Sequence, residues 1–109
     1  MNYNIKTILI EEKEYTILIG KNAHGNEEII RMSHPESIWM HLNGISSAHV
    51  ILDSKGDLIP KRYINQVSGL LFQHKTNVPR NTKVIYTQVK NVKLTKTPGS
   101  VTTKNTRFI

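Results

Sequence analysis

The fold of this chain is decided by the stretch SIWMHLNGISSAHVIL, residues 37–52. Large apolar side chains alternate with others along residues 37–42 and again along residues 48–52, a period that is typical of strands with one buried face. Asn43-Gly44 between the two runs is a strong turn signal. The stretch therefore predicts a β-hairpin.

The register of this hairpin decides which side chains become neighbours. With Ile45 at the apex of the connection, His41 lies opposite His49 and Trp39 lies opposite Ile51. Residues directly opposite each other share a face of the sheet, so the two imidazoles would be neighbours. A slip of one residue would separate them, since it moves one strand's side chains to the other face.

Upstream of the hairpin, the sequence predicts two strands and a short helix. A run rich in β-branched residues occupies positions 5–10, and Tyr15, Ile17 and Ile19 alternate with Thr16 and Leu18 after a charged turn at 11–14. Asn26 followed by two glutamates predicts the cap and first turn of a helix, where acids suit the helix dipole. This helix must end at His34-Pro35, because the residue before proline disfavours the helical region.

Downstream of the hairpin, the best helical pattern of the chain begins at Pro60 and predicts a long helix over about 60–75. Its periodic positions are Ile64, Val67, Leu71 and His74. A strand over 83–88, an irregular lysine-rich segment over 89–96, a turn at Pro98-Gly99 and terminal strand pieces at 101–103 and 107–109 follow. We expect an α+β fold in one domain, residues 1–109, with an antiparallel or mixed sheet, one long helix and one short helix.

The composition excludes several classes of protein. The chain has 109 residues and no cysteine, so it forms neither a disulfide framework nor a thiolate metal site. No stretch approaches the roughly 20 apolar residues that span a bilayer, and no secretory signal is evident. We expect a cytoplasmic protein without a membrane contact; the sequence does not indicate its oligomeric state.

The charge is divided unevenly along the chain. Residues 1–60 hold five basic and eight acidic residues, whereas residues 61–109 hold ten basic residues and no acid, for a formal net charge of +7. A basic half without acids is the electrostatic pattern of a nucleic-acid-binding protein. The alternative is a solvated basic surface without a polyanionic ligand.

The order of motifs along the chain resembles the NFACT-R domain, also called the domain of unknown function 814. The motifs that carry the resemblance are, in order, Gly20-Lys21-Asn22, Asn26-Glu27, Trp39-x-His41, Ser47-Ala48-His49-Val50, Val84-x-Tyr86-Thr87, Lys90-Asn91-Val92-Lys93 and Pro98-Gly99-x-Val101. They cover about residues 15–103. The Ser-Ser-Ala-His-Val run is more similar to a standalone branch of the family, found in a coiled-coil-domain-containing protein.

The resemblance implies an RNA-binding module related to the C-terminal domain of ribosome quality-control factors once labelled fibronectin-binding proteins. Those factors support template-free tailing of stalled chains through other domains, so tailing is not expected from this sequence. The partners implied are RNA, as tRNA or rRNA, and the ribosome or translation factors. DNA is a second candidate, because phosphate contacts carry no base information.

Five candidate RNA contacts lie in the first half of the chain. Lys21 and Asn22 precede a helix, where backbone N–H groups favour anions; alternatively, Asn22 only adopts a left-handed turn. Trp39 could stack on a base, although core packing is the more common role of tryptophan. His41 and His49 could contact phosphate, most strongly when protonated. Their alternative is two imidazoles satisfied by neighbouring backbone.

The remaining candidates lie in the basic half: Arg80, Lys83, Lys90, Asn91, Lys93 and Lys96. The last four, in an irregular segment near Tyr86, are the strongest candidates for phosphate contacts; alternatively, they form a charged edge that prevents strand pairing. No spacing matches a known zinc motif, so no metal or other cofactor is expected. No aspartate near Ser46 and Ser47 completes a hydrolase triad.

Three functions remain after this reading of the sequence. The first is a noncatalytic RNA-binding module, whose affinity falls with salt. The second is a protein-docking module of a translation quality-control complex. The third is a metal-independent ribonuclease, in which His41 and His49 act as general base and acid.

Overall fold

A computed structural model describes residues 1–73 and 75–109 of the chain. The main sheet has six strands in the order β1-β2-β4-β3-β5-β8, and every pairing is antiparallel. The strands are β1 (Tyr3–Ile10), β2 (Lys13–Gly20), β3 (Ile38–Leu42), β4 (Val50–Leu52), β5 (Val84–Gln88) and β8 (Arg107–Phe108). A separate hairpin joins β6 (Val92–Leu94) to β7 (Val101–Thr103). The α+β prediction is confirmed, and its sheet is antiparallel.

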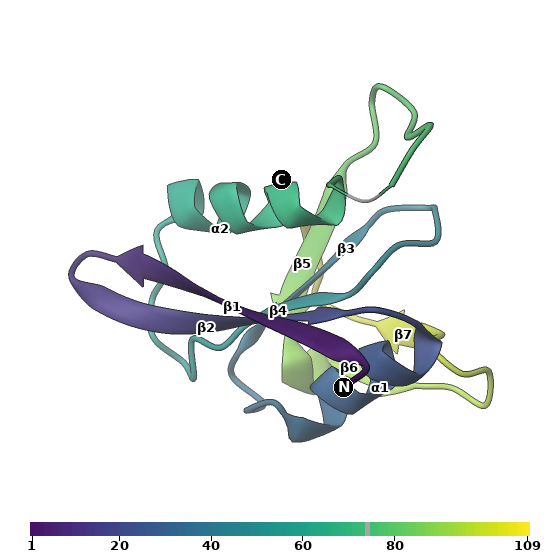
Figure 1. Cartoon of the computed structure of the whole chain (residues 1–109), viewed down its shortest axis with the longest axis horizontal. Coiled ribbons are helices and arrows are strands. Elements are labelled where there is room, and N and C mark those ends of the chain that lie inside the picture. The colour runs from purple at the N-terminus through teal and green to yellow at the C-terminus, as the bar shows by residue number, and fades with distance from the viewer. Residues whose placement is uncertain (74) are drawn as a thin grey trace.

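The helices cover opposite faces of the main sheet. Helix α2 (Lys61–Ser68), extended by the 3₁₀ turn η1 (Gly69–Leu71), covers one face, and α1 (Ala23–Met32) covers the other together with the β6–β7 hairpin (Figure 1). A second 3₁₀ turn, η2 (Val89–Asn91), leads from β5 into β6. Of the described residues, no helix is long and apolar enough to cross a bilayer.

Alternation along β3 explains how one strand serves two cores. Met40 and Leu42 pack toward α2, whereas Trp39 packs toward α1. The predicted hairpin register is confirmed, because Trp39 pairs with Ile51 and Met40 pairs with Val50. The strand predicted over 48–52 is shorter than expected and begins at Val50.

Both helix predictions need correction at their ends. The α-helical part of the second helix ends at Ser68, because Gly69 opens a 3₁₀ turn, so α2 with eight residues is shorter than α1 with ten. The part of this prediction that concerned His74 lies outside the described residues. The first helix begins at Ala23 rather than after Asn26, and its cap is Asn22, whose side chain accepts from the N–H of Gly25 at 2.8 Å.

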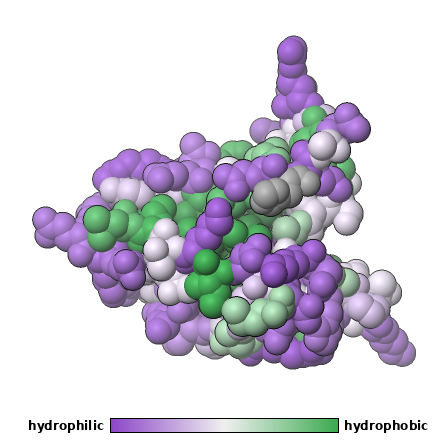
Figure 2. All heavy atoms as spheres, in the orientation of Figure 1, coloured by the Kyte–Doolittle hydropathy of each residue, from purple (hydrophilic) through white to green (hydrophobic). Residues whose placement is uncertain are grey.

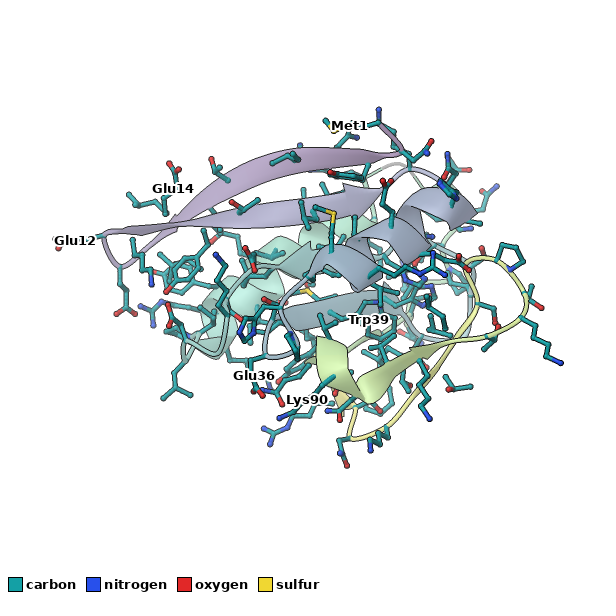
Figure 3. The ribbon with its side chains drawn as sticks, turned by 90° about the horizontal axis from the view of Figure 1, so that it is seen from below. Met1, Glu12, Glu14, Glu36, Trp39 and Lys90 are labelled. Atoms are coloured by element: carbon teal, nitrogen blue, oxygen red, sulfur yellow. The ribbon has the colours of Figure 1, made fainter. Side chains whose placement is uncertain are left out.

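The charged turn near the N-terminus is tighter than the sequence suggested. Lys13 pairs with Ile10 in the β1–β2 ladder, which leaves a two-residue turn of Glu11 and Glu12, both at positive φ. This geometry belongs to the hairpin turns whose twist matches that of the strands. Glu12 and Glu14 lie at the far tip of this hairpin (Figure 3).

Candidate nucleic-acid interface

Most motifs in the first half of the sequence meet the Pro98-Gly99 motif at one place in the fold. A pocket of about 930 Å³ opens at the end of the sheet opposite the β1–β2 turn, and we call it the motif pocket. Its lining comes from residues 19–23, 44–49 and 98–101, from Leu70, Leu71 and Lys75, and from isolated residues of the strands and α1. The loops that contribute lie together on the right of Figure 1, and Figure 2 shows the surface indented there.

Three aromatic rings form the floor of the motif pocket. Trp39 and His41 lie two residues apart on β3, with their ring planes parallel within 2° and their centroids 5.8 Å apart. His49 stands edge-on to both, with its centroid 4.8 Å from that of His41 and 5.4 Å from that of Trp39. The prediction that His41 and His49 share a face is therefore confirmed, since the hairpin register brings them together.

His49 is held by three hydrogen bonds. Its Nδ1 accepts from Trp39 Nε1 at 3.1 Å, its backbone N–H donates to Asn26 Oδ1 at 3.0 Å, and its carbonyl accepts from the N–H of Gly20 at 3.0 Å. His49 is only 2% exposed. Because Nδ1 is an acceptor, the proton of the neutral ring must lie on Nε2. The His49 ring thus bonds to the Trp39 side chain rather than to neighbouring backbone, as the alternative interpretation had expected, and it lines the motif pocket.

Position 20 has no room for a side chain, because Asn26 occupies the space beside it. A Cβ at Gly20 would lie 1.9 Å from Asn26 Oδ1, the atom that receives the N–H of His49. Asn26 is buried in α1 and does not cap the helix, so the capping prediction is wrong. The sequence signal was the asparagine itself; only the packing of α1 against the sheet shows that its amide bonds to the N–H of His49.

Both imidazoles are held in the neutral form. Burial and, to a smaller extent, the nearby His41 lower the pKa of His49 to about 3. Burial also lowers the pKa of His41; hydrogen bonds to the backbone of Leu42 and Ser47 oppose this shift, and the positive charge of Lys75 adds to it. Phosphate binding by imidazolium, as the sequence suggested, is therefore disfavoured in the free protein at neutral pH.

Trp39 is the most deeply buried ring of the floor of the motif pocket. Its side chain is 1% exposed and lies inside the fold beneath α1 (Figure 3). Trp39 therefore packs in the core, which is the alternative that the sequence left open. His41 is only half buried, so it offers more of its ring to the pocket than Trp39 does.

The rim of the pocket is basic. Lys21 and Asn22 come from the β2–α1 loop, as predicted, and Lys75 comes from the segment after η1. No acidic residue occurs among the described residues that line the pocket. Sequence reasoning did not single out Lys75, and the only signal for it was its membership of the acid-free half.

A glycine turn completes the rim. The N–H of Gly99 donates to Glu27 Oε2 at 3.0 Å, which attaches the β6–β7 turn to α1. Gly99 has a φ of +78°, and a Cβ there would lie 2.8 Å from that of Ala23. Glycine is required at this close approach, so the Pro98-Gly99 motif positions the turn that lines the pocket.

The six candidates in the basic half lie outside the lining of the motif pocket. Lys93 and Lys96 are exposed on the β6–β7 hairpin, whose turn forms part of the rim. Arg80 and Lys83 are exposed in the segment between η1 and β5. Their contact with RNA stays a prediction.

Lys90 and Asn91 have protein partners. Lys90 Nζ donates to Glu36 Oε1 at 2.9 Å, and this ion pair lowers the pKa of Glu36 (Figure 3). Asn91 Nδ2 donates to Thr87 Oγ1 at 3.0 Å, and its carbonyl accepts from the N–H of Lys104 at 3.1 Å. Asn91 therefore fastens η2 to the neighbouring segments, and an RNA phosphate would compete with Glu36 for Lys90.

Most basic groups of the second half have no acidic partner in the described structure. The five ion pairs are Lys13–Asp57, Arg31–Glu27, Lys55–Asp53, Arg62–Glu11 and Lys90–Glu36. The basic residues outside these pairs are Lys6, Lys21, Lys61, Lys75, Arg80, Lys83, Lys93, Lys96, Lys104 and Arg107. In the described residues, no three histidine, aspartate or glutamate side chains gather as a metal site would require.

Comparison with known families identifies the domain. Residues 4–105 match the NFACT protein RNA binding domain. The chain belongs to the NFACT-R family. The family resemblance expected from the sequence is thereby confirmed. The lining of the motif pocket includes residues of the motifs that carried this resemblance, among them Lys21, Trp39, His49 and Gly99.

The NFACT-R relatives are longer than this chain. Coiled-coil domain-containing protein 25 is 35% identical over 92 residues in Mus musculus and 34% identical over 92 residues in Bos taurus. Each alignment covers 79% of this chain and 44% of the relative. The chain therefore spans less than half the length of these relatives.

A solved structure shares this fold. The C-terminal region of the fibronectin/fibrinogen-binding protein from Streptococcus suis aligns with 97% of this chain and 44% of that one, with a TM-score of 0.79. Sequence identity in this alignment is 21%, so the likeness shows a common fold.

Proposed function

We propose that this NFACT-R domain is a noncatalytic RNA-binding module that acts in the cytoplasm on tRNA or rRNA, with the ribosome or translation factors as neighbouring partners. The observation that carries the proposal is the motif pocket, whose rim holds Lys21 and Lys75 and no described acid. RNA binding is also what the family's description names. DNA remains a competitor to be tested, because lysine–phosphate contacts do not distinguish the two polymers.

The charge distribution supports a polyanionic ligand at the pocket end. The acids Glu11, Glu12 and Glu14 lie at the tip and base of the β1–β2 turn, at the opposite end of the sheet. Basic side chains without acidic partners flank the pocket through Lys93 and Lys96 on one side and the 75–83 segment on the other. Such a field attracts phosphates and orients the approach of an RNA.

The neutral histidines argue against the ribonuclease alternative. A general acid needs a proton at the working pH, and catalysis is most efficient when its pKa lies near that pH. Burial holds the pKa of His49 at about 3, and its Nδ1 already accepts from Trp39. Incubation of the purified protein with labelled RNA at neutral pH should leave the RNA intact.

Fluorescence anisotropy with labelled tRNA, single-stranded RNA and duplex DNA of equal length, across a salt series, tests the proposal. The double variant Lys93→Ala with Lys96→Ala should weaken RNA binding about tenfold and reduce the slope of log K against log salt by about 1.4. The matched control is Lys13→Ala with Lys55→Ala, which removes the same charge from the opposite end of the sheet. Equal losses in both double variants would contradict a defined RNA surface, and no binding near physiological salt would favour protein docking.

A further inference from the structure

We propose that the motif pocket receives one unpaired nucleotide of the RNA, with its base stacked on His41 and its phosphate beside Lys75. This inference rests on the proposed function and adds which part of the RNA enters the fold. A flat lysine surface would hold any backbone, whereas a pocket with an aromatic floor distinguishes a free base from a paired one.

The aromatic floor supplies the stacking surface. Trp39 lies parallel to His41 and is almost completely buried, so it supports the imidazole from the protein side. His41 lines the motif pocket and is only half buried. Bases stack on aromatic rings in single-stranded RNA recognition, and His41 is the ring of the three with exposed area to offer.

The floor is rigid before any ligand binds. The bond from Trp39 Nε1 to His49 Nδ1 fixes the indole against β4, and Asn26 fixes the backbone of His49. His49 packs edge-on against His41 at a centroid distance of 4.8 Å. A platform that is already ordered loses little conformational entropy when a base stacks on it.

The charges at the rim fit one phosphate beside the base. Lys75 and His41 line the same pocket. The positive charge of Lys75 also contributes to the lowered pKa of His41. Lys21 approaches from the β2–α1 loop on another side of the rim. No acid occurs among the described residues that line the pocket. Glu27, outside this lining, accepts the N–H of Gly99 at 3.0 Å.

The walls make the pocket selective for an unpaired base. Ile19, Ile45 and Ile85 contribute apolar surface, and the loop over residues 44–48 contributes serine hydroxyls and backbone. A volume of about 930 Å³ lies within the range of small-molecule sites, which is about 300–1,000 Å³. A base that is flipped out of a loop or lies at a strand end can enter such a pocket, whereas a base within a duplex cannot reach it.

The experiment uses the whole chain and follows the ring signals of its histidines and tryptophan by NMR. AMP is the ligand, and adenosine and inorganic phosphate are the two half-ligands. AMP should shift the signals of His41 and the Trp39 indole N–H, and it should bind at least fivefold more tightly than adenosine or phosphate. A bound phosphate should also raise the pKa of His41 in a pH titration, because it adds negative charge beside Lys75.

Four variants separate stacking, charge and folding. His41→Ala should weaken AMP binding about tenfold, whereas His41→Phe, which keeps an aromatic ring, should stay within about threefold. Lys75→Ala should weaken AMP about fivefold and leave adenosine unchanged within about twofold. His34→Ala, which removes an exposed imidazole that does not line the pocket, is the matched control and should change neither affinity.

The outcomes distinguish this inference from the proposed function. If RNA binds with a steep salt dependence while AMP shifts no pocket signal, the nucleotide site is wrong and the RNA-binding surface stands. If phosphate binds as tightly as AMP, or His41→Phe loses as much as His41→Ala, base stacking is wrong. If neither RNA nor AMP binds, both proposals fail.

Discussion

On one face of the main sheet, α2 covers a core of aliphatic side chains, whereas on the other face α1 covers a core with polar side chains built into it. Met40, Leu42, Val50 and Leu52 meet α2, and the buried hydroxyl of Ser68 there bonds within its own helix to the carbonyl of Asn65. On the α1 face, Asn26, His49 and Thr87 are buried beside Trp39.

The contrast teaches which residues serve the fold and which serve the site. A neutral hydrogen bond contributes only about 1 kcal/mol net, because folding gives up bonds to water. Apolar side chains would stabilise the α1 face as well as the hydrogen-bonded side chains of Trp39, His49 and Asn26 do. We infer that this polar chain is present because it positions the floor of the motif pocket. Variants of the two faces can break or sharpen this comparison.

The largest difference in stability should come from replacing one glycine by alanine on each face of the sheet. Gly20→Ala places a Cβ 1.9 Å from Asn26 Oδ1 and should destabilise the fold by about 3 kcal/mol. Gly69→Ala, at the end of α2, meets no atom within 4 Å at an α-helical φ of −57° and should stabilise by about 0.5 kcal/mol. Urea denaturation measures both. Similar values for the two variants would show that the Gly20–Asn26 contact is not tight.

The next effect is a pH dependence that belongs to the α1 face. Burial lowers the pKa of His49 to about 3, whereas an unfolded histidine titrates near 6.5. Between these values the unfolded chain binds a proton that the folded chain does not, so stability is full above pH 6.5 and falls as the pH drops. The slope should reach about 1.4 kcal/mol per pH unit.

Urea denaturation between pH 7 and 4.5 checks this slope. His41 contributes with the same sign, because its pKa is also lowered. Glu36 and Asp57, whose pKa values are lowered by Lys90 and Lys13 respectively, add their losses only near and below pH 4. His49→Gln should flatten the slope, and Val67→Ala on the α2 face should lower stability without changing it. An unchanged slope in His49→Gln would refute the assignment.

A smaller effect should follow from removing one buried amide. Asn26→Ala leaves the buried N–H of His49 without its 3.0 Å partner and should lower stability by about 2 kcal/mol. Ser68→Ala on the α2 face removes a hydroxyl that bonds only to a carbonyl of its own helix, and should change stability by less than about 0.5 kcal/mol. Equal losses of stability in the two variants would mean that buried polar groups contribute equally to the two faces.

The elements and register of this fold were largely readable from the sequence because they depend on local periodicity. The alternation around Asn43-Gly44 predicted the pairing of Trp39 with Ile51 and the meeting of His41 with His49. The helix ends were less readable. Asn26 has the residue type and acidic neighbours of a cap, but Asn22 takes that role because Asn26 is needed at His49.

The site could be predicted as a set of motifs but not as a pocket. The sequence could not show that Lys90 is paired with an acid whereas Lys93 is not. The partner of Lys90 is Glu36, which lies 54 positions away in the chain. The role of Lys75 depends on its lining the same pocket as the β3 side chains Trp39 and His41, which no local pattern of the sequence indicates. In the same way, the tryptophan motif suggested a stacking surface, and only the packing of α1 shows that His41 has more of its ring available.

The smallest effect concerns the caps of the two helices. Asn22 accepts from the N–H of Gly25, whereas Pro60 caps α2 without a side-chain hydrogen bond. Asn22→Ala should therefore lower stability by about 1 kcal/mol, and Asn22→Ser should restore most of it, because serine is also a good cap. Urea denaturation distinguishes the variants. If serine fails to restore stability, the contribution of Asn22 lies in its 3.3 Å bond from Nδ2 to Asn2 Oδ1, which ties the β2–α1 loop to the start of β1.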